Sequence, residues 1–392
     1  MKRVLLAGIG FVAASLVPAA GHAQGTVKIG LIMPYSGQFA DTATQMDDGI
    51  KLYLKQHGNK LGGMNVEIVR KDVGGIDPPV AKRLAQELVT RDNVDILAGF
   101  CLTPNALAAG EVSAQAKKFM VVMNAATAII TLKSPYMART SFTVPQLTQT
   151  LGTWAEKNGI KSAYTMVTDY GPGIDAETSF QKGFTTAGGS ILGSVRMAVQ
   201  NPDFTAYVQR AKDLNPQGIF VMIPGGSQPG AFGKALAERG IDPQKTEVLG
   251  QAEIADEHAV ASMGDLALGI ITAANYDYNL DNPMNKDFVK AYNADYSRNP
   301  DFFSVGGYDG MHLIDASLQK TGGKTDGESL IGAAKGMSWE SPRGPLSIDP
   351  ETRDAIQTVY IQKVEKVNGH LVNVVIASVA NVKDPVKAAM NK

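Results

Sequence analysis

Ser36, Thr103 and Thr127 each follow a short apolar segment of the chain, at the point where a strand is predicted to end. Their hydroxyl groups donate hydrogen bonds without adding charge, which suits the orientation of a small carboxylate. Thr103 also precedes Pro104, and proline is favoured at the start of a helix, so we expect Thr103 to cap one. The free N–H groups at a helix start attract an anion. The pattern indicates an anion-binding site, although each residue alone is also explained as a plain cap or turn.

The other reactive side chains form no recognisable catalytic or metal-binding pattern. Cys101 is a candidate nucleophile, but no histidine has a sequence context that pairs with it, so a small apolar lining role is favoured. The helical spacing around Asp47 and Asp48 places both carboxylates on the exposed face of a helix. His258 follows two acidic residues without the spacing typical of a metal site. We therefore expect no catalytic residue and no metal.

Two glycine-rich segments match parts of nucleotide-binding motifs. Gly8–Ala13 fits the dinucleotide fingerprint, but a basic start precedes it in place of a strand, and the acidic residue about 20 positions further on is missing. Gly171–Gly173 lacks the lysine and hydroxyl of a phosphate-binding loop, and we interpret it as a tight turn that leaves Tyr170 free to move. We therefore expect no cofactor.

Residues 1–23 are predicted to be an export signal. Lys2–Arg3 forms a basic start, Val4–Val17 is apolar, and Gly21–Ala23 offers small residues at the positions that a signal peptidase reads. The apolar run is shorter than the roughly 20 residues that a membrane span needs. We expect cleavage after about Ala23 and a soluble exported protein.

Composition argues against nucleic acid and anionic membranes as partners. Without the signal, the 392-residue chain keeps 35 basic and 38 acidic residues, a formal charge of −3 that gives no long-range attraction for either. Cys101 is the only cysteine, so no intrachain disulfide can form. The length exceeds one ordinary core and fits two domains.

Short apolar runs alternate with amphipathic helical patterns along most of the chain. The strand candidates are Val27–Met33, Val66–Arg70, Val94–Gly99, Phe119–Met123, Ala163–Val167, Gly218–Ile223, Gly269–Thr272 and Val359–Val364. Continuous apolar strands between helices predict an α/β fold with parallel sheets covered on both faces. In such sheets, ligands bind beyond the carboxyl ends of the strands.

Two runs of this alternation predict two doubly wound, Rossmann-like lobes. We expect residues 24–145 and 276–345 to form the N-terminal lobe, and residues 146–275 and 346–392 to form the C-terminal lobe. Three crossings of the chain would then form a hinge, and the ligand cleft would lie between the lobes. Lobes joined in this way can close around a ligand.

A series of short motifs runs the length of the chain. They are KIGLIMPYSGQFA at Lys28–Ala40, LAGFCLTPNALA at Leu97–Ala108, NAAT at Asn124–Thr127, DYGPG at Asp169–Gly173, DF at Asp203–Phe204, PGG at Pro224–Gly226, YDGMHL at Tyr308–Leu313 and RGPLSID at Arg343–Asp349. In this order and spacing, they make the chain similar to the periplasmic solute-binding proteins of ABC importers for branched-chain amino acids and related hydrophobic solutes. The resemblance implies the type I periplasmic-binding fold.

The resemblance also implies roles for particular residues. In that family, the loops after the first, third and fourth strands of the N-terminal lobe bind the carboxylate of the ligand. The matching positions here are Ser36, Cys101, Leu102, Thr103, the backbone of Ala125 and the hydroxyl of Thr127. Tyr170 matches a residue that closes over the ligand, and the loop of Gly226, Ser227 and Gln228 matches a further contact.

Two departures from the family pattern leave the ligand class open. The loop at Phe100 is larger and more apolar than the serine-rich run of aliphatic amino-acid binders. Glu253 stands one residue later than the family's ammonium-binding glutamate, with Gln251 at the intervening position. A buried ammonium without a carboxylate costs several kcal/mol, so the orientation of Glu253 decides between an amino acid and an aromatic acid. The aromatic candidates to line a ring-binding pocket, or simply to pack in the core, are Phe100, Tyr170, Phe204 and Tyr276.

We therefore expect a periplasmic, monomeric solute-binding protein that captures a small hydrophobic carboxylate by lobe closure. The ligand would be a branched-chain amino acid or an aromatic acid such as a benzoate or cinnamate derivative, and the partner would be the transmembrane permease subunits of an ABC importer. The alternatives are a ligand-sensing receptor module of the same fold and an exported α/β hydrolase.

Overall fold

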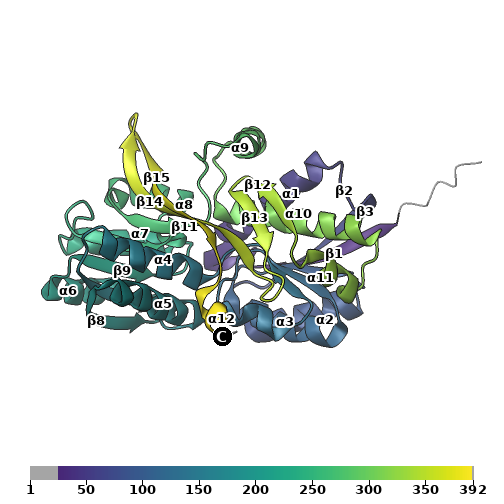
Figure 1. The fold of residues 1–392 in the computed structure, drawn as a ribbon, viewed down its shortest axis with the longest axis horizontal. Coiled ribbons are helices and arrows are strands. Elements are labelled where there is room, and N and C mark those ends of the chain that lie inside the picture. Colours follow the sequence, from purple (N-terminus) through teal and green to yellow (C-terminus); the bar gives the residue numbers. More distant parts are fainter. Residues whose placement is uncertain (1–24, 391–392) are drawn as a thin grey trace, which may run out of the picture.

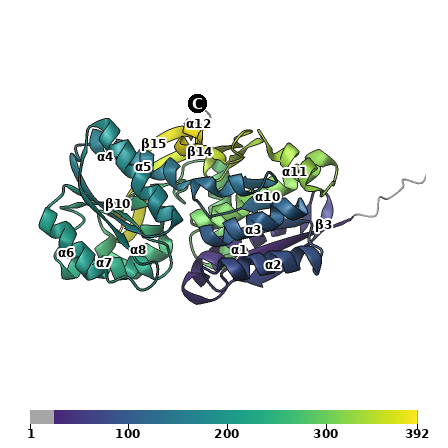
Figure 2. The same cartoon turned by 90° about the horizontal axis from the view of Figure 1, so that it is seen from below.

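Two α/β lobes lie side by side in the computed structural model of the protein, which describes residues 25–390 (Figure 1). Each lobe has a central sheet with helices on both faces, and long strands near the carboxyl end of the chain run between the lobes (Figure 2). The predicted export signal and its cleavage site lie outside the described residues.

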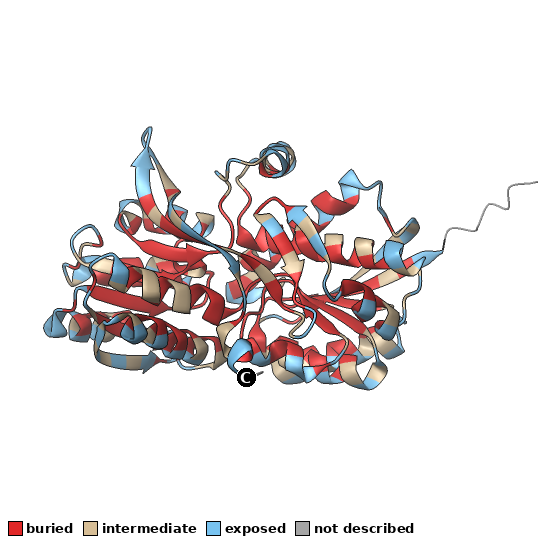
Figure 3. Ribbon diagram, in the orientation of Figure 1, coloured by how far each residue is buried: buried red, intermediate tan, exposed pale blue. Residues whose placement is uncertain are grey.

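The N-terminal lobe is built on a sheet with strand order β2-β3-β1-β4-β5-β6, parallel except for β2. Its strands are β1 (Thr26–Met33), β2 (Lys60–Leu61), β3 (Met64–Asp72), β4 (Ile96–Gly99), β5 (Phe119–Val122) and β6 (Met137–Arg139). Every residue of β4 and β5 is buried, as expected of apolar strands between two helical layers (Figure 3).

Helices from distant parts of the chain cover this sheet. They are α1 (Ala40–Gln56), α2 (Pro78–Thr90), α3 (Thr103–Ala116), α9 (Pro283–Tyr296), α10 (Phe302–Thr321) and α11 (Gly327–Ala334), with the short 3₁₀ helices η1 (Gly37–Phe39) and η2 (Ala128–Lys133). α1 and α10 pack closely because a glycine stands at their contact: a Cβ atom at Gly49 would overlap the carbonyl oxygen of Ser304.

The C-terminal lobe is built on a second sheet with strand order β12-β13-β14-β11-β10-β9-β7-β8, and β15 pairs with β14. Its strands are β7 (Ser162–Thr168), β8 (Ser190–Met197), β9 (Gly218–Met222), β10 (Glu247–Gln251), β11 (Ile271–Ala274), β12 (Ser338–Ser341), β13 (Gly344–Ile348), β14 (Ala355–Val367) and β15 (His370–Val382). Its helices are α4 (Val144–Lys157), α5 (Gly171–Ala187), α6 (Phe204–Leu214), α7 (Gln228–Glu238), α8 (Glu257–Met263), the 3₁₀ helices η3 (Ala252–Ile254) and η4 (Gly264–Ala267), and the terminal α12 (Pro385–Met390). The strands from β7 to β11 are parallel, and β14 is antiparallel to β11.

The chain passes between the two sheets after β6, after β11 and after α11. The predicted lobe limit at residue 345 falls inside β13, which pairs with β14 of the C-terminal sheet. The division of the chain into lobes at residues 145, 275 and 345 remains a prediction.

A buried ionic cluster lies beside the first of these crossings, at the end of β6. Asp354 accepts hydrogen bonds from Arg139 at 2.7 and 3.0 Å and from the ammonium of Lys387 at 2.6 Å. These three side chains are between 0% and 3% exposed. Arg139 also donates to the carbonyls of Ala125 and Thr127, at 3.2 and 2.8 Å. The cluster therefore fixes the loop after β5 to the turn between β13 and β14 and to α12.

The prediction for Asp47 and Asp48 is wrong. Both carboxylates are buried, because Arg70 of β3 and Arg298, just after α9, lie against the polar side of α1. Asp47 pairs with Arg70 at 3.0 Å and with Lys51 at 2.9 Å, and Asp48 pairs with Arg298 at 2.8 Å. The helical spacing had predicted that water solvates these two carboxylates, and in the structure ion pairs take the place of that water.

The crossing cluster predicts a large loss of stability when its carboxylate is removed. Asp354→Asn leaves two buried cations without a counter-charge, which should lower the free energy of unfolding by about 3–5 kcal/mol. Urea denaturation followed by circular dichroism measures this change. The matched control is Asp265→Asn, which removes the partner of Lys366 in an exposed pair and should cost less than about 1 kcal/mol. Equal effects of the two substitutions would contradict this account of the cluster.

Candidate ligand-binding site

A pocket lies between the lobes where the carboxyl ends of parallel strands from both sheets face one another. We call it the interlobe pocket. Its lining comprises Phe39, Thr42, Cys101, Leu102, Thr103, Asn124, Ala126, Val144, Tyr170, Pro172, Met222, Pro224, Gly225, Glu253 and Phe303. The loops after β1, β4 and β5 contribute from one side, and the loops after β7, β9 and β10 contribute from the other. Both sheets therefore place their ligand-binding edges at the same cavity.

A pair of buried threonines stands at one part of this pocket. Thr127 donates a hydrogen bond to the hydroxyl of Thr103 at 3.0 Å, and each residue is only 3% exposed. Since Thr103 accepts this bond, its own O–H is left to donate to another group. Thr103 is the first residue of α3, with Pro104 behind it. The prediction that Thr103 caps this helix is wrong: Leu102 is the N-cap residue, no side chain caps the helix, and the Thr103 hydroxyl lies within its first turn.

A second helix start meets the threonine pair from the opposite lobe. A Cβ atom at Gly171, the first residue of α5, would lie 3.4 Å from the hydroxyl oxygen of Thr127 and 3.8 Å from the methyl of Thr103. The first N–H groups of a helix have no partner within the helix and carry partial positive charge. Hydroxyls and two helix starts thus converge where a small anion can be held without a cationic side chain.

Glu253 lines the pocket from the C-terminal lobe. Its Oε2 atom accepts a hydrogen bond from the backbone N–H of Gly225 at 2.9 Å. Burial raises the pKa of Glu253 to about 7, although the Gly225 N–H and the amides of Gln251 and Asn124 favour the ionised form. No Lys, Arg or His is among the described residues that line the pocket, and Glu253 is the one carboxylate there.

The remaining titratable groups of the pocket are neutral at physiological pH. Burial raises the pKa of the Cys101 thiol to about 12, so the thiol stays protonated. Burial also raises the pKa of the Tyr170 phenol well above its usual value. Cys101 therefore acts as an apolar wall of the pocket and lacks the thiolate that a nucleophile needs.

The lobes touch each other on several sides of the pocket. Asp175 at the start of α5 accepts a hydrogen bond from the N–H of Ala128 at 2.8 Å. The His258 ring in α8 lies 3.7 Å from the Asp41 carboxylate in α1. Gly226, with φ at +81°, sits so close to the opposite lobe that a Cβ atom there would overlap the carbonyl oxygen of Gln38. The structure is therefore a closed form.

The structure brings together five of the residues predicted for the site and places others nearby. Cys101, Leu102, Thr103, Tyr170 and Glu253 line the interlobe pocket. Thr127 lies directly behind Thr103, and Gly226 adjoins the lining residue Gly225. Gln251 is fully buried at the end of β10, and its amide faces Glu253 without a hydrogen bond of normal geometry.

The other predicted site residues lie away from the pocket lining. Ser36 is exposed and its N–H donates to Asp72, and Ser227 is exposed as well. The N–H of Ala125 donates to the Phe100 carbonyl, so this backbone donor is already used. The role of these residues in binding stays a prediction.

The aromatic candidates other than Tyr170 pack elsewhere. Phe100 adopts a left-handed backbone with φ at +67°, and its side chain is buried in the core beneath α2 and α3, while the next residue, Cys101, lines the pocket. Phe204 packs edge-on against Phe232 inside the C-terminal lobe. Tyr276 lines a different pocket and donates to Asn285 at 2.8 Å.

Several lining residues were missed by the sequence analysis, namely Phe39, Thr42, Asn124, Ala126, Val144, Pro172, Met222, Pro224 and Phe303. Phe39 and Asn124 stand inside motifs that follow predicted strands, and this position was a usable signal. Phe303 lies at the start of α10, far along the chain, and no local pattern marks it. Phe39, Tyr170 and Phe303 give the pocket aromatic walls.

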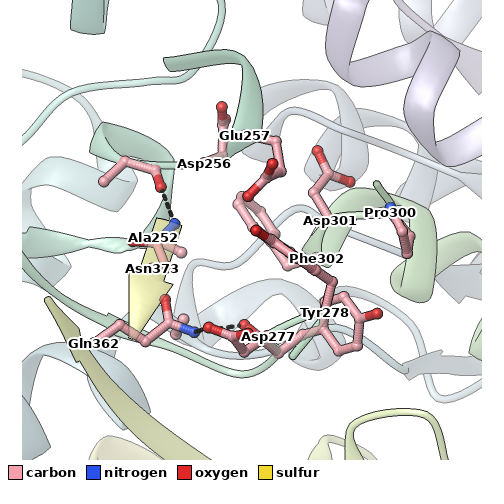
Figure 4. A pocket seen from close by; sticks show the side chains of 13 residues that line it. Ala252, Asp256, Glu257, Asp277, Tyr278, Pro300, Asp301, Phe302, Gln362 and Asn373 are labelled. Atoms are coloured by element: carbon pink, nitrogen blue, oxygen red, sulfur yellow. Dashed lines mark hydrogen bonds between the residues drawn. The ribbon is translucent and has the colours of Figure 1, made fainter. Parts of the chain in front are cut away.

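Figure 4 shows a second, acidic pocket, whose lining residues Ala252 and Phe302 are each next in sequence to a residue of the interlobe pocket. Its carboxylates come from both lobes: Asp256 and Glu257 at the start of α8, Asp277 after β11, and Asp301 at the start of α10. Asp277 accepts a hydrogen bond from Gln362 at 3.0 Å, whereas Asp301 Oδ2 is buried without a partner. Burial, together with repulsion from Asp301 and Asp277, raises the pKa of Glu257 to about 7. Burial, together with repulsion from Asp41, raises the pKa of Asp301 to about 6.

Neither a metal site nor a membrane span is found in the part of the chain that the structure describes. Over residues 25–390, no group of three or more histidine, cysteine or acidic side chains is arranged to hold a metal ion. Within the same range, no helix is both long and apolar enough to cross a membrane.

Comparisons with known proteins agree on one family. A sequence profile of the family described as periplasmic binding protein matches residues 26–369. A relative from Brucella abortus (strain 2308), Leu/Ile/Val-binding protein homolog 6, is 41% identical over 369 residues, which span 93% of this chain and 94% of the relative.

Two solved structures are similar over nearly their whole length. A solute binding protein of an ABC transporter from Rhodopseudomonas palustris BisB5, in complex with 3,4-dihydroxy benzoic acid, has a TM-score of 0.89 and 49% identity, covering 92% of this chain and 99% of that chain. An ABC transporter solute binding protein from R. palustris, in complex with 4-hydroxybenzoate, has a TM-score of 0.89 and 40% identity over the same shares.

The contact at Gly226 predicts that an added methyl group blocks closure. Gly226→Ala should weaken ligand binding at least about tenfold, because its Cβ would overlap the opposite lobe in the closed form. Small-angle scattering with ligand should show a less compact particle than the wild type. Gly240→Ala is the matched control, because Gly240 is also left-handed at +68° but its Cβ would meet nothing closer than Lys212 at 3.8 Å. An affinity loss as large in the Gly240 variant as in the Gly226 variant would sink this interpretation.

The acidic pocket predicts that stability falls as the pH rises from about 4 to about 7. Its carboxyl groups bind protons more tightly in the folded than in the unfolded chain. Their contribution to the free energy of unfolding is therefore complete at low pH and is lost as they ionise. Asp301→Asn removes one of these groups but keeps a helix cap, so the decrease in Tm between pH 5 and pH 8 should be smaller. Calorimetry at the two pH values measures this difference.

The control for this substitution is Asp326→Asn, which alters an exposed cap of α11 whose backbone hydrogen bond from Ser329 lowers the pKa of the carboxyl. In the Asp326 variant, the decrease in Tm between pH 5 and pH 8 should be as large as in the wild type. A wild-type decrease that persists unchanged in the Asp301 variant would refute the proposed repulsion.

Proposed function

Because the chain belongs to the periplasmic binding protein family, we propose that it is the solute-binding protein of an ABC importer and that it carries a benzoate-class aromatic carboxylate. The predicted two-lobed α/β fold is confirmed by the structural relatives. The protein captures the anion in the interlobe pocket, closes over it, and delivers it to the transmembrane permease subunits. Export to the periplasm, cleavage after about Ala23 and action as a monomer belong to the same proposal.

The observation that carries this proposal is the construction of the interlobe pocket. Thr103, Thr127 and two helix starts offer uncharged donors for a carboxylate at one part of the cavity. The walls provided by Phe39 and Phe303 are flat and apolar, and they suit a ring. The structural relatives at 49% and 40% identity are in complex with hydroxylated benzoates. Each of these ligands has a carboxylate and an aromatic ring.

The energetics allow such a ligand to bind well. A ligand of about ten heavy atoms has a ceiling near 15 kcal/mol at the best ligand efficiencies. A micromolar affinity requires only about 8 kcal/mol. The difference covers the desolvation of the carboxylate and the loss of motion on lobe closure.

A branched-chain amino acid is the second candidate ligand. Glu253 lines the interlobe pocket, where it can pair with an α-ammonium, and the relatives from Brucella are named as Leu/Ile/Val-binding protein homologs. The benzoate class is favoured because the solved relative with the higher identity is bound to an aromatic acid.

A thermal-shift screen of benzoates, hydroxybenzoates, cinnamates and branched-chain amino acids tests the proposal. At least one aromatic acid should raise the Tm, and Thr103→Val should weaken its binding about 10–100-fold, because a hydrogen bond to a charged group is lost. Thr44→Val makes the same change on the exposed side of α1 and should leave affinity as in the wild type. A protein that responds to no aromatic acid, or that chemically converts one, would overturn the proposal.

A further inference from the structure

We propose that Glu253 and Asn124 together recognise a hydroxyl group on the ligand's ring, at a position remote from the carboxylate. This inference rests on the proposed function and narrows it: hydroxybenzoates should be preferred over benzoates that lack a ring donor. Neither residue then contacts the carboxylate of the ligand.

Hydrogen-bond acceptors gather at this part of the pocket, and the Asn124 amide oxygen has no donor. Glu253 Oε2 receives the N–H of Gly225 at 2.9 Å, which holds the carboxyl group in place against the cavity. Asn124 donates through its amide nitrogen to the Cys101 carbonyl at 2.9 Å, and this bond fixes the orientation of its amide. The Asn124 Oδ1 atom is buried without a hydrogen-bond partner, and the residue is 5% exposed.

Buried acceptors of this kind call for a donor. Buried polar atoms in native proteins are almost always paired, so an orphaned oxygen in a ligand pocket indicates what the ligand must bring. Asn124 Oδ1 and the Glu253 carboxylate both accept, and a ring hydroxyl donates. A catechol brings two such donors, and a methoxy or fluoro substituent of similar position brings none.

Electrostatics fixes the direction in which the ligand lies. A benzoate carboxylate and an ionised Glu253 repel each other strongly in a cavity with no cationic side chain among its described lining residues. The carboxylate therefore lies at Thr103 and the helix starts, where partial positive charge gathers. The ring then carries its remote substituents toward the part of the pocket at Glu253 and Asn124.

An α-amino acid would satisfy Glu253 in a different way. Its ammonium is attached one carbon away from its carboxylate, so both groups would have to be bound at one place. The ring hydroxyl instead lies across the ring from the carboxylate, and the aromatic walls of Phe39 and Phe303 remain in use. Removing the charge of Glu253 should therefore affect the binding of an amino acid and the binding of a hydroxybenzoate differently.

Isothermal titration calorimetry at pH 7.5 tests the inference. The ligands are 4-fluorobenzoate, 4-hydroxybenzoate, 3,4-dihydroxybenzoate and leucine, and the proteins are the wild type, Glu253→Gln and Glu257→Gln. The wild type should bind 4-hydroxybenzoate about tenfold or more tightly than 4-fluorobenzoate, because the hydroxyl donates to a charged acceptor. Glu253→Gln should reduce this ratio to about threefold or less without weakening 4-fluorobenzoate. Glu257→Gln is the matched control in the acidic pocket and should keep the wild-type ratio.

Failure of the inference and failure of the proposed function give different results. If neither benzoate nor its derivatives bind the wild type, the proposed function is wrong. If they bind without preference for the hydroxyl, or if Glu253→Gln keeps that preference, the inference is wrong and the function stands. Tight leucine binding that is lost in Glu253→Gln would instead assign Glu253 to an ammonium. Even if Glu253→Gln does not fold, the ratio of wild-type affinities for 4-hydroxybenzoate and 4-fluorobenzoate tests the inference.

Discussion

An organic anion has to be held in a buried cavity whose described lining contains no cationic side chain. Moving a carboxylate out of water is costly, and only fixed donors can replace its hydration. In the proposed binding mode those donors are the hydroxyls of a threonine pair and the free N–H groups at the starts of two helices, one from each lobe. Because the α5 start comes from the opposite lobe, binding of the anion and closure of the lobes are coupled.

The buried cluster at the crossings gives this site its rigidity. Arg139 holds the carbonyls of Ala125 and Thr127, and Asp354 and Lys387 hold Arg139. The loop that carries Thr127 is thereby attached to the turn between β13 and β14 and to α12. Lobe closure at Gly226 and Asp175 can then bring donors to a threonine pair that does not move. A site of hydroxyls needs this support, since uncharged donors act only at short range.

Sequence reasoning predicted the two-lobed fold and the loop of Cys101 and Thr103, because buried strands and a Thr-Pro helix start are local patterns. It placed Phe100 at the site, but a left-handed backbone turns that side chain into the core. The packing of α10 brings Phe303 to the pocket, and Arg70 of β3 buries Asp47. Both contacts join segments far apart in the sequence, which no local pattern encodes. The sequence did not show where the side chain of Glu253 points, because its carboxylate is held by a hydrogen bond from the N–H of Gly225 in another loop.

The most direct measurement is a crystal structure of the protein with 4-hydroxybenzoate bound. The account predicts the carboxylate within hydrogen-bond distance of the Thr103 hydroxyl and of the first N–H groups of α5, with the ring hydroxyl between Glu253 and Asn124. A ligand seated outside the interlobe pocket, or one whose carboxylate lies against Glu253, would contradict it.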